Sequence, residues 1–203
     1  MKKVLIGNQN WMSRNLDVPQ FRNGDLITEA KTWKEWEKGN ENKTPMYCYY
    51  DFDPENDSKY GKFYNWFAVS DSRLLAPEGY YIPTDNDWVI LAEFIGEENE
   101  LNYEDDLTPF LKSRTSWADQ RNGDDQYSFN AIASGKIDMS GMCEYAEVAC
   151  YWWSVSEEGE SGGQMLAGNP DFARYRGIGE YDEFMVGKCN KMCGLSVRCL
   201  CEE

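Results

Sequence analysis

The last third of the chain changes its hydrophobic pattern twice. An aromatic run, YWWS at residues 151–154, and an alternating run, GLSVRC at residues 194–199, enclose a segment with almost no hydrophobic period. Short apolar or alternating runs are typical of core strands, whereas a polar segment without a period is typical of a loop. The pattern therefore predicts two core strands that hold out an irregular surface over about residues 154–193.

The first half of the chain contains two clear element signals. Residues 3–18 predict a short strand pair, because an apolar run is followed by a turn at Gly7 and by a second apolar run. Thr84, with Asp87 three residues later, is typical of a helix N-cap. The apolar positions that follow have helical spacing up to Gly96, which is expected to end this helix.

Two shorter helical segments are also predicted. Trp33 and Trp36 are three residues apart and are expected to share one face of a helical turn that starts near Thr32. From Tyr64 onward the apolar spacing suits a helix packed on one side. Many short strands, two early helices and long irregular loops together predict a single α+β domain over residues 1–203.

One loop carries carboxylates at alternating positions. They are Asp51, Asp53, Glu55 and Asp57. Such a pattern is compatible with calcium binding, but the glycine at the sixth position and the glutamate at the twelfth position of an EF-hand are missing. We therefore interpret this stretch as a solvated loop.

The charge balance narrows the classes of function. The formal net charge is -16, and the chain contains no histidine. A strongly acidic chain is unsuited to nucleic acid or to anionic membranes, because both are bound through Lys and Arg. The missing histidine removes the commonest general base and the commonest zinc ligand. An enzyme would have to work with carboxylates, Lys, Tyr or Cys, and we predict that the protein is not an enzyme. We interpret the acidity as a solvated, self-repelling surface, with carboxylate cation sites as the open alternative.

No targeting or membrane segment is evident in the sequence. No stretch approaches the ~20 apolar residues of a membrane span. The run before Gly7 is also too short for a secretory signal, whose apolar part needs ~7–15 residues. We predict no membrane insertion and no export signal. The protein could be cytosolic, a processed fragment, a virion component or a protein of the cell surface, and the sequence leaves these alternatives open.

The cysteines favour thiols or disulfides over a metal site. There are seven, so at least one lacks a partner within the chain: Cys48, Cys143, Cys150, Cys189, Cys193, Cys199 and Cys201. No paired CxxC motifs are present, which disfavours structural zinc. One or two disulfides or simple buried thiols are expected instead.

Six motifs carry a resemblance to a known family. In order they are IGNQNWMSRNL, FRNGD, YGKFYNWFAV, LAPEGYYIPTDNDW, YWWS and GLSVRC. The chain resembles the Fibrobacter succinogenes major paralogous domain, a branch of the C-type lectin-like superfamily, over nearly its whole length. The resemblance is weakest around residues 97–140.

The resemblance implies a C-type lectin-like fold with two early helices, a small antiparallel sheet and long loops whose outer face binds ligands. It also implies that the two ends pair, with VLIG beside LSVRC. Leu195 and Val197 are expected to alternate with outward-facing Ser196 and Arg198 in a half-buried strand. The positions expected to form the fixed scaffold are Trp152, Trp153, Gly194, Val197 and Cys199.

Similar domains serve as variable proteins of diversity-generating retroelements, in which adenine-directed mutagenesis rewrites a C-terminal ligand surface. The positions that vary in that class correspond here to Gly177, Gly179, Tyr181, Asp182, Phe184, Val186, Gly187, Cys189, Asn190 and Cys193. All ten are residue types reachable from the codon AAC by changing its adenines. With Arg174, Tyr175 and Arg176 as additional anchors, they form the predicted ligand-binding set. The expected partner is an unidentified protein or cell-surface ligand.

Two other functions remain as alternatives. A calcium-dependent carbohydrate-binding domain would use an EPN or QPD tripeptide, and only the related Asn169–Pro170–Asp171 is present. An enzyme of the formylglycine-generating type would use a cysteine pair, which Cys189 and Cys193 could imitate. Few cations that could lower a cysteine pKa stand near this pair in the sequence. No cofactor is predicted, and calcium remains open.

Overall fold

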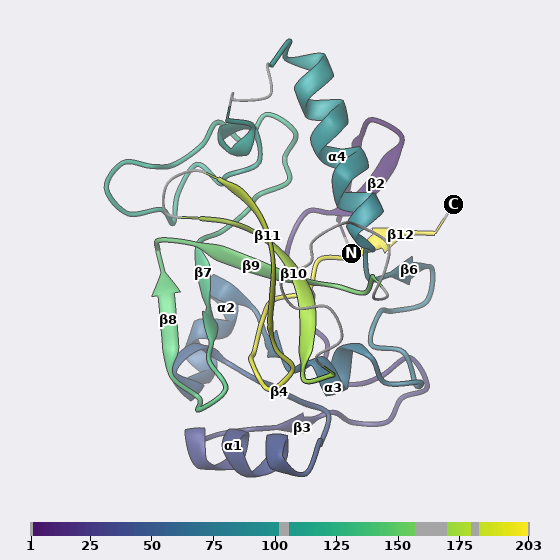
Figure 1. Ribbon diagram of the computed structural model, residues 1–203, viewed down its shortest axis with the longest axis vertical. Helices are drawn as coiled ribbons and strands as arrows, with labels where there is room; N and C mark the ends of the chain where they lie inside the picture. The colour runs from purple at the N-terminus through teal and green to yellow at the C-terminus, as the bar shows by residue number, and fades with distance from the viewer. Residues whose placement is uncertain (1, 102–105, 157–169, 180–182, 203) are drawn as a thin grey trace.

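The computed structural model describes residues 2–101, 106–156, 170–179 and 183–202 (Figure 1). Within these ranges the strands form three sheets, of four, five and three strands. The described helices comprise four α-helices and three short 3-10 helices. The predicted α+β, C-type lectin-like arrangement of two helices and one small antiparallel sheet is therefore wrong. Two strands form in the C-terminal segment where a long loop was expected, and the strands of the described residues are distributed over three sheets and not one.

The four-stranded sheet joins the two ends of the chain. Its strand order is β1 (Lys3–Ile6), β2 (Gln9–Met12), β12 (Leu200–Cys201) and β6 (Tyr80–Tyr81). The predicted strand pair at the N-terminus is confirmed, and Gly7 has the positive φ of 61° that its tight turn needs. The predicted pairing of VLIG with LSVRC is wrong. The tight turn lays β2 against β1, so β2 lies between the two end strands and Trp11 pairs with both Val4 and Leu200.

The C-terminal GLSVRC segment links two sheets. Leu195 bridges to Tyr64 of the three-stranded sheet, whereas Ser196 bridges to Trp152 of the five-stranded sheet. Because other parts of the protein cover the GLSVRC segment on all sides, Ser196 and Arg198 are 0% exposed. The predicted half-buried alternation is therefore wrong. The two terminal nitrogens of the Arg198 guanidinium donate to the carbonyl oxygens of Met12 and Phe129 and to Oδ1 of Asn15, whereas its buried Nε has no hydrogen-bond partner among the described residues.

The longest helix, α4 (Asp85–Glu98), has the predicted N-terminus. The Thr84 hydroxyl accepts from the Asp87 amide, and the Asp87 carboxylate accepts from the Thr84 amide, which completes a capping box. Gly96 does not end the helix. The helix continues to Glu98 because Asn99 serves as its C-cap residue and its amide donates back to the last turn.

Helix α1 (Trp33–Glu41) begins where the sequence predicted, and Thr32 is its N-cap residue. Its two tryptophans do not share an environment: Trp36 is fully buried, whereas Trp33 is 50% exposed. Trp33 occupies the first helical position, beyond the elements that cover Trp36. The two side chains are three residues apart in the helix, as predicted, but only Trp36 is packed into the core.

The three-stranded sheet lies between α1 and the rest of the molecule. It consists of β3 (Thr28–Glu29), β4 (Met46–Cys48) and β5 (Phe63–Tyr64). The predicted helix from Tyr64 is one turn, α3 (Trp66–Val69), capped by Asn65. The acidic loop is partly ordered into η1 (Tyr50–Phe52), η2 (Pro54–Asn56) and α2 (Asp57–Tyr60). A further 3-10 turn is η3 (Thr108–Phe110).

The five-stranded sheet contains the two longest strands of the described chain. Its order is β11 (Phe184–Asn190), β10 (Phe172–Ile178), β9 (Cys150–Ser154), β7 (Ser134–Ile137) and β8 (Cys143–Ala146). The expectation of an irregular segment is thus wrong for residues 172–178 and 184–190. Alternation is absent there because β10 is covered on both faces and buries glycine and arginine as well as apolar residues. Residues 157–169 and 180–182 lie outside the described ranges.

The core is divided by the five-stranded sheet. Trp152 belongs to a cluster under α4, and Trp153 to a cluster with Tyr64 and Leu195 on the opposite side. This confirms the expectation that the adjacent tryptophans pack on both faces. All seven cysteines are free thiols, and Cys48, Cys150, Cys193 and Cys199 are buried. Within the described residues, no helix has both the length and the apolar character needed to cross a bilayer.

Candidate functional site

The register of β9, β10 and β11 assigns the predicted ligand-binding residues to two opposite faces. Residues paired across antiparallel strands point to the same side. Arg174 pairs with Ser154 and Lys188 on the side of α4, which we call the helix face. Tyr175 pairs with Trp153 and Gly187 on the other side, which we call the tyrosine face. The predicted single surface is therefore divided between two faces.

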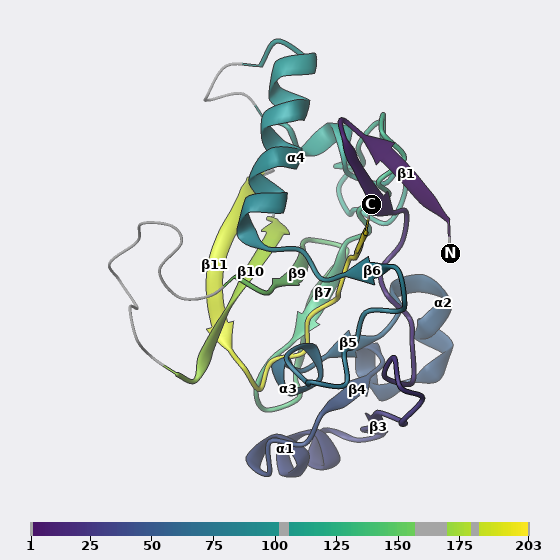
Figure 2. The ribbon, with the colours of Figure 1, turned by 90° about the vertical axis from the view of Figure 1, so that its right-hand side faces the viewer.

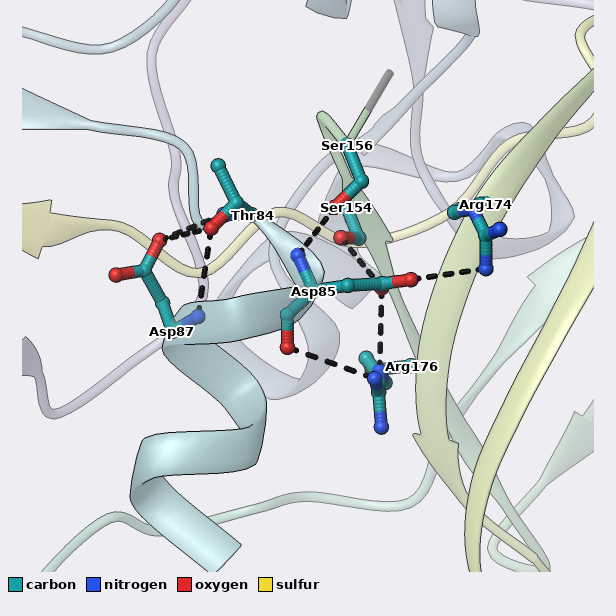
Figure 3. A network of polar contacts seen from close by, with 7 residues as sticks. All are labelled: Thr84, Asp85, Asp87, Ser154, Ser156, Arg174 and Arg176. Carbon is teal, nitrogen blue, oxygen red and sulfur yellow. Dashed lines mark hydrogen bonds and ion pairs between the residues drawn. The ribbon is translucent and has the colours of Figure 1, made fainter. Parts of the chain in front are cut away.

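The helix face is fixed by one buried carboxylate (Figure 3). Asp85, in the first turn of α4, is 3% exposed. Its carboxylate lies 3.0 Å from Nη1 of Arg174 and 3.2 Å from Nε of Arg176, and it accepts a 2.9 Å hydrogen bond from the Ser154 hydroxyl. The Asp85 amide donates to the Ser156 hydroxyl. A negative side chain is also favourable at a helix N-terminus.

This network changes the expected role of two predicted anchors. Arg176 is buried and Arg174 is half-buried, and both ion-pair with Asp85. Removing one partner of a buried ion pair costs about 3–5 kcal/mol, because the remaining charges lose their compensation. The two arginines therefore hold β10 against α4.

The tyrosine face carries a row of aromatic side chains across three strands. The Tyr175 and Tyr151 ring centroids are 5.5 Å apart, and those of Tyr151 and Tyr145 are 6.2 Å apart, both edge-to-face. The Lys136 ammonium lies 5.3 Å from the Tyr145 centroid and 5.7 Å from that of Tyr151, and it ion-pairs with Glu144 at 3.4 Å. Tyr145 is 47% exposed at the outer end of the row. Burial raises the pKa of Tyr151 and of Tyr175, so both phenols stay neutral.

Two glycines allow this close packing. A Cβ added at Gly187 would lie 2.6 Å from the Tyr175 ring, which covers the glycine from the neighbouring strand. A Cβ added at Gly177 would lie 2.5 Å from the carbonyl oxygen of Cys150, an atom of the backbone. The first contact can be relieved by a side-chain movement, whereas the second requires the sheet itself to shift.

The predicted ligand-binding residues differ in exposure. Val186 on β11 is 56% exposed. The half-buried positions are Arg174, Tyr175, Phe184, Gly187, Cys189 and Asn190. The buried positions are Arg176, Gly177, Gly179 and Cys193. Tyr181 and Asp182 lie outside the described residues. The predicted scaffold positions, Trp152, Trp153, Gly194, Val197 and Cys199, are all buried.

Sequence reasoning missed four residues that shape this region. In the sequence, Asp85 is marked only by its position next to the helix cap Thr84. Its partners, Arg174 and Arg176, lie about ninety residues away along the chain. Tyr151 stood in the aromatic run, but only the register shows that it faces Tyr175. Tyr145 and Lys136 belong to strands whose pairing the sequence did not reveal.

Two alternative chemistries find limited support in the described residues. No group of three or more His, Cys, Asp or Glu side chains that could hold a metal ion occurs within them. Asn169 lies outside them, so calcium binding stays a prediction. Burial, together with a hydrogen bond to Cys193, raises the pKa of the Cys189 thiol well above its usual value. Because the thiolate is the reactive form, this environment disfavours a nucleophilic role for Cys189, whereas the hydrogen bond from Cys189 lowers the pKa of the Cys193 thiol.

A pocket of about 240 Å³ opens at the end of the sheet where β10 begins and β11 ends, and residues of both faces line it. Trp66 and Phe172 contribute aromatic surface, and Arg174, Lys188 and Lys191 contribute cationic groups. The Lys191 ammonium donates to the carbonyl oxygen of Pro170. This pocket continues the surface of β11 towards the turn that follows it.

Comparison with known proteins gives one match. The family model described as the Fibrobacter succinogenes major domain matches residues 4–200, nearly the whole chain. Neither a curated protein nor a solved structure matches the chain.

Proposed function

The chain belongs to the Fibrobacter succinogenes major domain family, and from this premise we propose that it is a non-enzymatic binding protein. Its ligand is a protein or another cell-surface molecule. Its contact surface is the tyrosine face together with the edge strand β11. The proposal does not depend on the predicted lectin-like fold class; kinship with that superfamily stays a prediction.

The observation that carries the proposal is the half-exposed tyrosine row. Tyr145, Tyr151 and Tyr175 present large aromatic surfaces with few rotatable bonds, mounted on paired strands. Such side chains lose little entropy on binding, and tyrosine is enriched among the residues that dominate interface energetics. Lys136 adds a charged group beside the rings.

We further propose that the chain is the variable protein of a diversity-generating retroelement, with replaceable positions concentrated on β11. Val186 is exposed, and the ring that covers Gly187 belongs to a movable side chain. Gly177 and Cys193 are buried, and replacing either would strain the frame. Substitutions on the edge strand β11 would then change the ligand, while the constant buried residues beneath it would preserve the fold.

Crosslinking tests the binding surface. A photoreactive benzophenone amino acid replaces Met185, which pairs with Gly177 and therefore lies on the tyrosine face, and the labelled protein is exposed to intact microbial cells and to their detergent-extracted surface proteins. A discrete crosslinked product is expected, and the substitution Tyr145→Ser is expected to abolish it without unfolding the chain. The matched control places the probe at Leu26, which is 76% exposed and far from the sheet in sequence. Equal crosslinking from both positions would contradict the proposed surface.

DNA sequencing tests the retroelement. The gene is expected to be accompanied by a nearly identical repeat of the segment that encodes residues 174–199. Differences between the two copies should replace adenines only, and they should fall at the codons for Val186, Gly187 and their neighbours on β11. Absence of the repeat would remove this part of the proposal and leave the binding surface untouched.

A further inference from the structure

A groove of about 580 Å³ lies between the start of α1 and the turn that joins β7 to β8. Trp33, Phe52 and Met142 contribute its apolar walls, and Asp51, Gly141 and Cys143 complete it. It is built from α1, η1 and the β7–β8 turn, and shares no residue with β10 or β11. The function proposed above does not use it.

The groove exposes large apolar side chains together. Trp33 is 50% exposed, Met142 is 66% exposed and nearby Met139 is 49% exposed. The core does not require Trp33, because Trp36 already fills the space beneath α1 with 0% exposure. Clustered exposed apolar groups on a soluble chain mark an interaction site more often than single ones do.

The walls of the groove are fixed before anything binds. A Cβ at Gly141 would lie 2.9 Å from the Cβ of Trp33, so the turn lies directly against α1. The Asp138 carboxylate holds this turn by accepting 2.8 Å hydrogen bonds from the amides of Ser140 and Met142. A preformed site loses less entropy on binding than a site that must be ordered.

The third wall is held in an unusual backbone conformation. Asp51 and Phe52 have consecutive positive φ angles of 54° and 56°. A bulky residue rarely adopts this region, because the conformation is strained. The Asp51 amide donates to Sγ of Cys143 at 3.0 Å, which ties this wall to β8. The strain places Phe52 in the groove and leaves Asp51 exposed beside it.

The charges beside the groove select the kind of occupant. Asp51 lines the groove, and Asp53 and Glu55 follow it, exposed, in the same acidic loop. The Lys34 ammonium lies 5.4 Å from the Trp33 ring centroid, so the ring already accepts a cation. A second copy of the chain is disfavoured, because each copy carries a net charge of -16 and like charges repel.

We propose that this groove binds a basic peptide segment of a partner protein. An apolar side chain of the peptide contacts Trp33, Phe52 and Met142, and flanking Lys or Arg side chains lie beside the carboxylates of Asp51 and Asp53. The alternating carboxylates of the acidic loop, which do not match a calcium-binding motif, would then contact the basic side chains of the peptide.

The test uses a short fluorescein-labelled peptide of alternating lysine and leucine. Anisotropy measures its affinity, and methyl NMR of methionine-labelled protein locates it. The Met142 and Met139 methyl signals are expected to shift, and that of the buried Met12 is not. Trp33→Ala should weaken binding by about tenfold or more, as expected for an aromatic anchor. Asp53→Asn, which keeps a capping oxygen, should weaken it by about two- to fivefold, the range of an exposed ion pair.

Three controls make the result decisive. Leu26→Ala, at a 76% exposed apolar position elsewhere, should leave the affinity unchanged. A lysine–serine peptide and a glutamate–leucine peptide should each bind much more weakly than the lysine–leucine peptide. Equal binding of the lysine–serine peptide, or unchanged affinity in a folded Trp33→Ala variant, would overturn the proposal. Concentration-dependent shifts of Met142 without peptide would overturn it in favour of self-association.

Discussion

Strands β10 and β11 are paired residue by residue over the same length, yet they have different environments. β10 lies between two strands, is covered on both faces and is held by Asp85. β11 is the terminal strand of the sheet, and its residues are half-buried or exposed. Figure 2 shows this difference, with β10 inside the molecule and β11 along its outer side. One strand pair can thus provide both a fixed support and a contact surface.

The substitution Asp85→Ala should have the greatest effect on stability. It removes the carboxylate that both the buried Arg176 and the half-buried Arg174 contact, and a loss of about 3–5 kcal/mol is expected. Urea unfolding followed by circular dichroism measures this loss. Replacing the whole triad with Asp85→Leu, Arg174→Met and Arg176→Met should cost less than Asp85→Ala alone. A loss under about 1 kcal/mol for Asp85→Ala would mean that the arginines do not fix β10.

Two glycine substitutions compare the strands directly. Gly177→Ala on β10 forces a Cβ against the Cys150 carbonyl oxygen and should cost about 1–3 kcal/mol. Gly187→Ala on β11 meets only the Tyr175 ring, which can rotate, so its cost should be clearly smaller. Thermal unfolding of both variants checks the order. The reverse order would show that β11, not β10, is the rigid strand.

Alkaline pH should weaken the support through Cys150 on β9. Burial raises the pKa of this thiol from 9.0 to about 12, so the thiol ionises in the unfolded chain first. Its contribution to stability is complete below pH 9 and is lost as the pH rises towards 12. At pH 10 the loss from this group should be on the order of 1 kcal/mol. The free energy of unfolding is measured at pH 7.5 and at pH 10. Its decrease between the two pH values should be smaller in Cys150→Ala than in the unaltered chain.

The smallest effect is expected at the exposed position of β11. Val186→Thr keeps the β-branched shape at a site that is 56% exposed, and its effect should stay within about 0.5 kcal/mol. Urea unfolding measures it under the same conditions as Asp85→Ala. A larger loss would indicate that β11 contributes to the core and cannot be freely replaced.

The sequence predicted the elements whose signals are local. The Thr84 cap, the Gly7 turn and the buried pair Trp152 and Trp153 are all present in the structure. Each depends on residues within a few positions of one another or on size alone. The family was also identified correctly from six short motifs.

The predictions that depended on distant partners were wrong. β10 was read as a loop because Arg176 and Gly177 stand where a buried strand normally carries apolar residues. Arg176 is buried only because Asp85 lies beside it, and Gly177 because the Cys150 carbonyl oxygen approaches so closely. Neither partner is visible from hydrophobic spacing. For the same reason the three-sheet arrangement could not be derived from local patterns.

The carboxylate of Asp85 ion-pairs with two arginines, Arg174 and Arg176. Substitutions at these three positions are therefore expected to depend on one another during evolution. Replacing Asp85 alone removes the carboxylate with which both arginines ion-pair. Replacing both arginines removes the cations that compensate the Asp85 charge. Related chains are therefore expected to keep all three residues or to exchange all three together. Covariation of positions 85, 174 and 176 among family members would record this constraint.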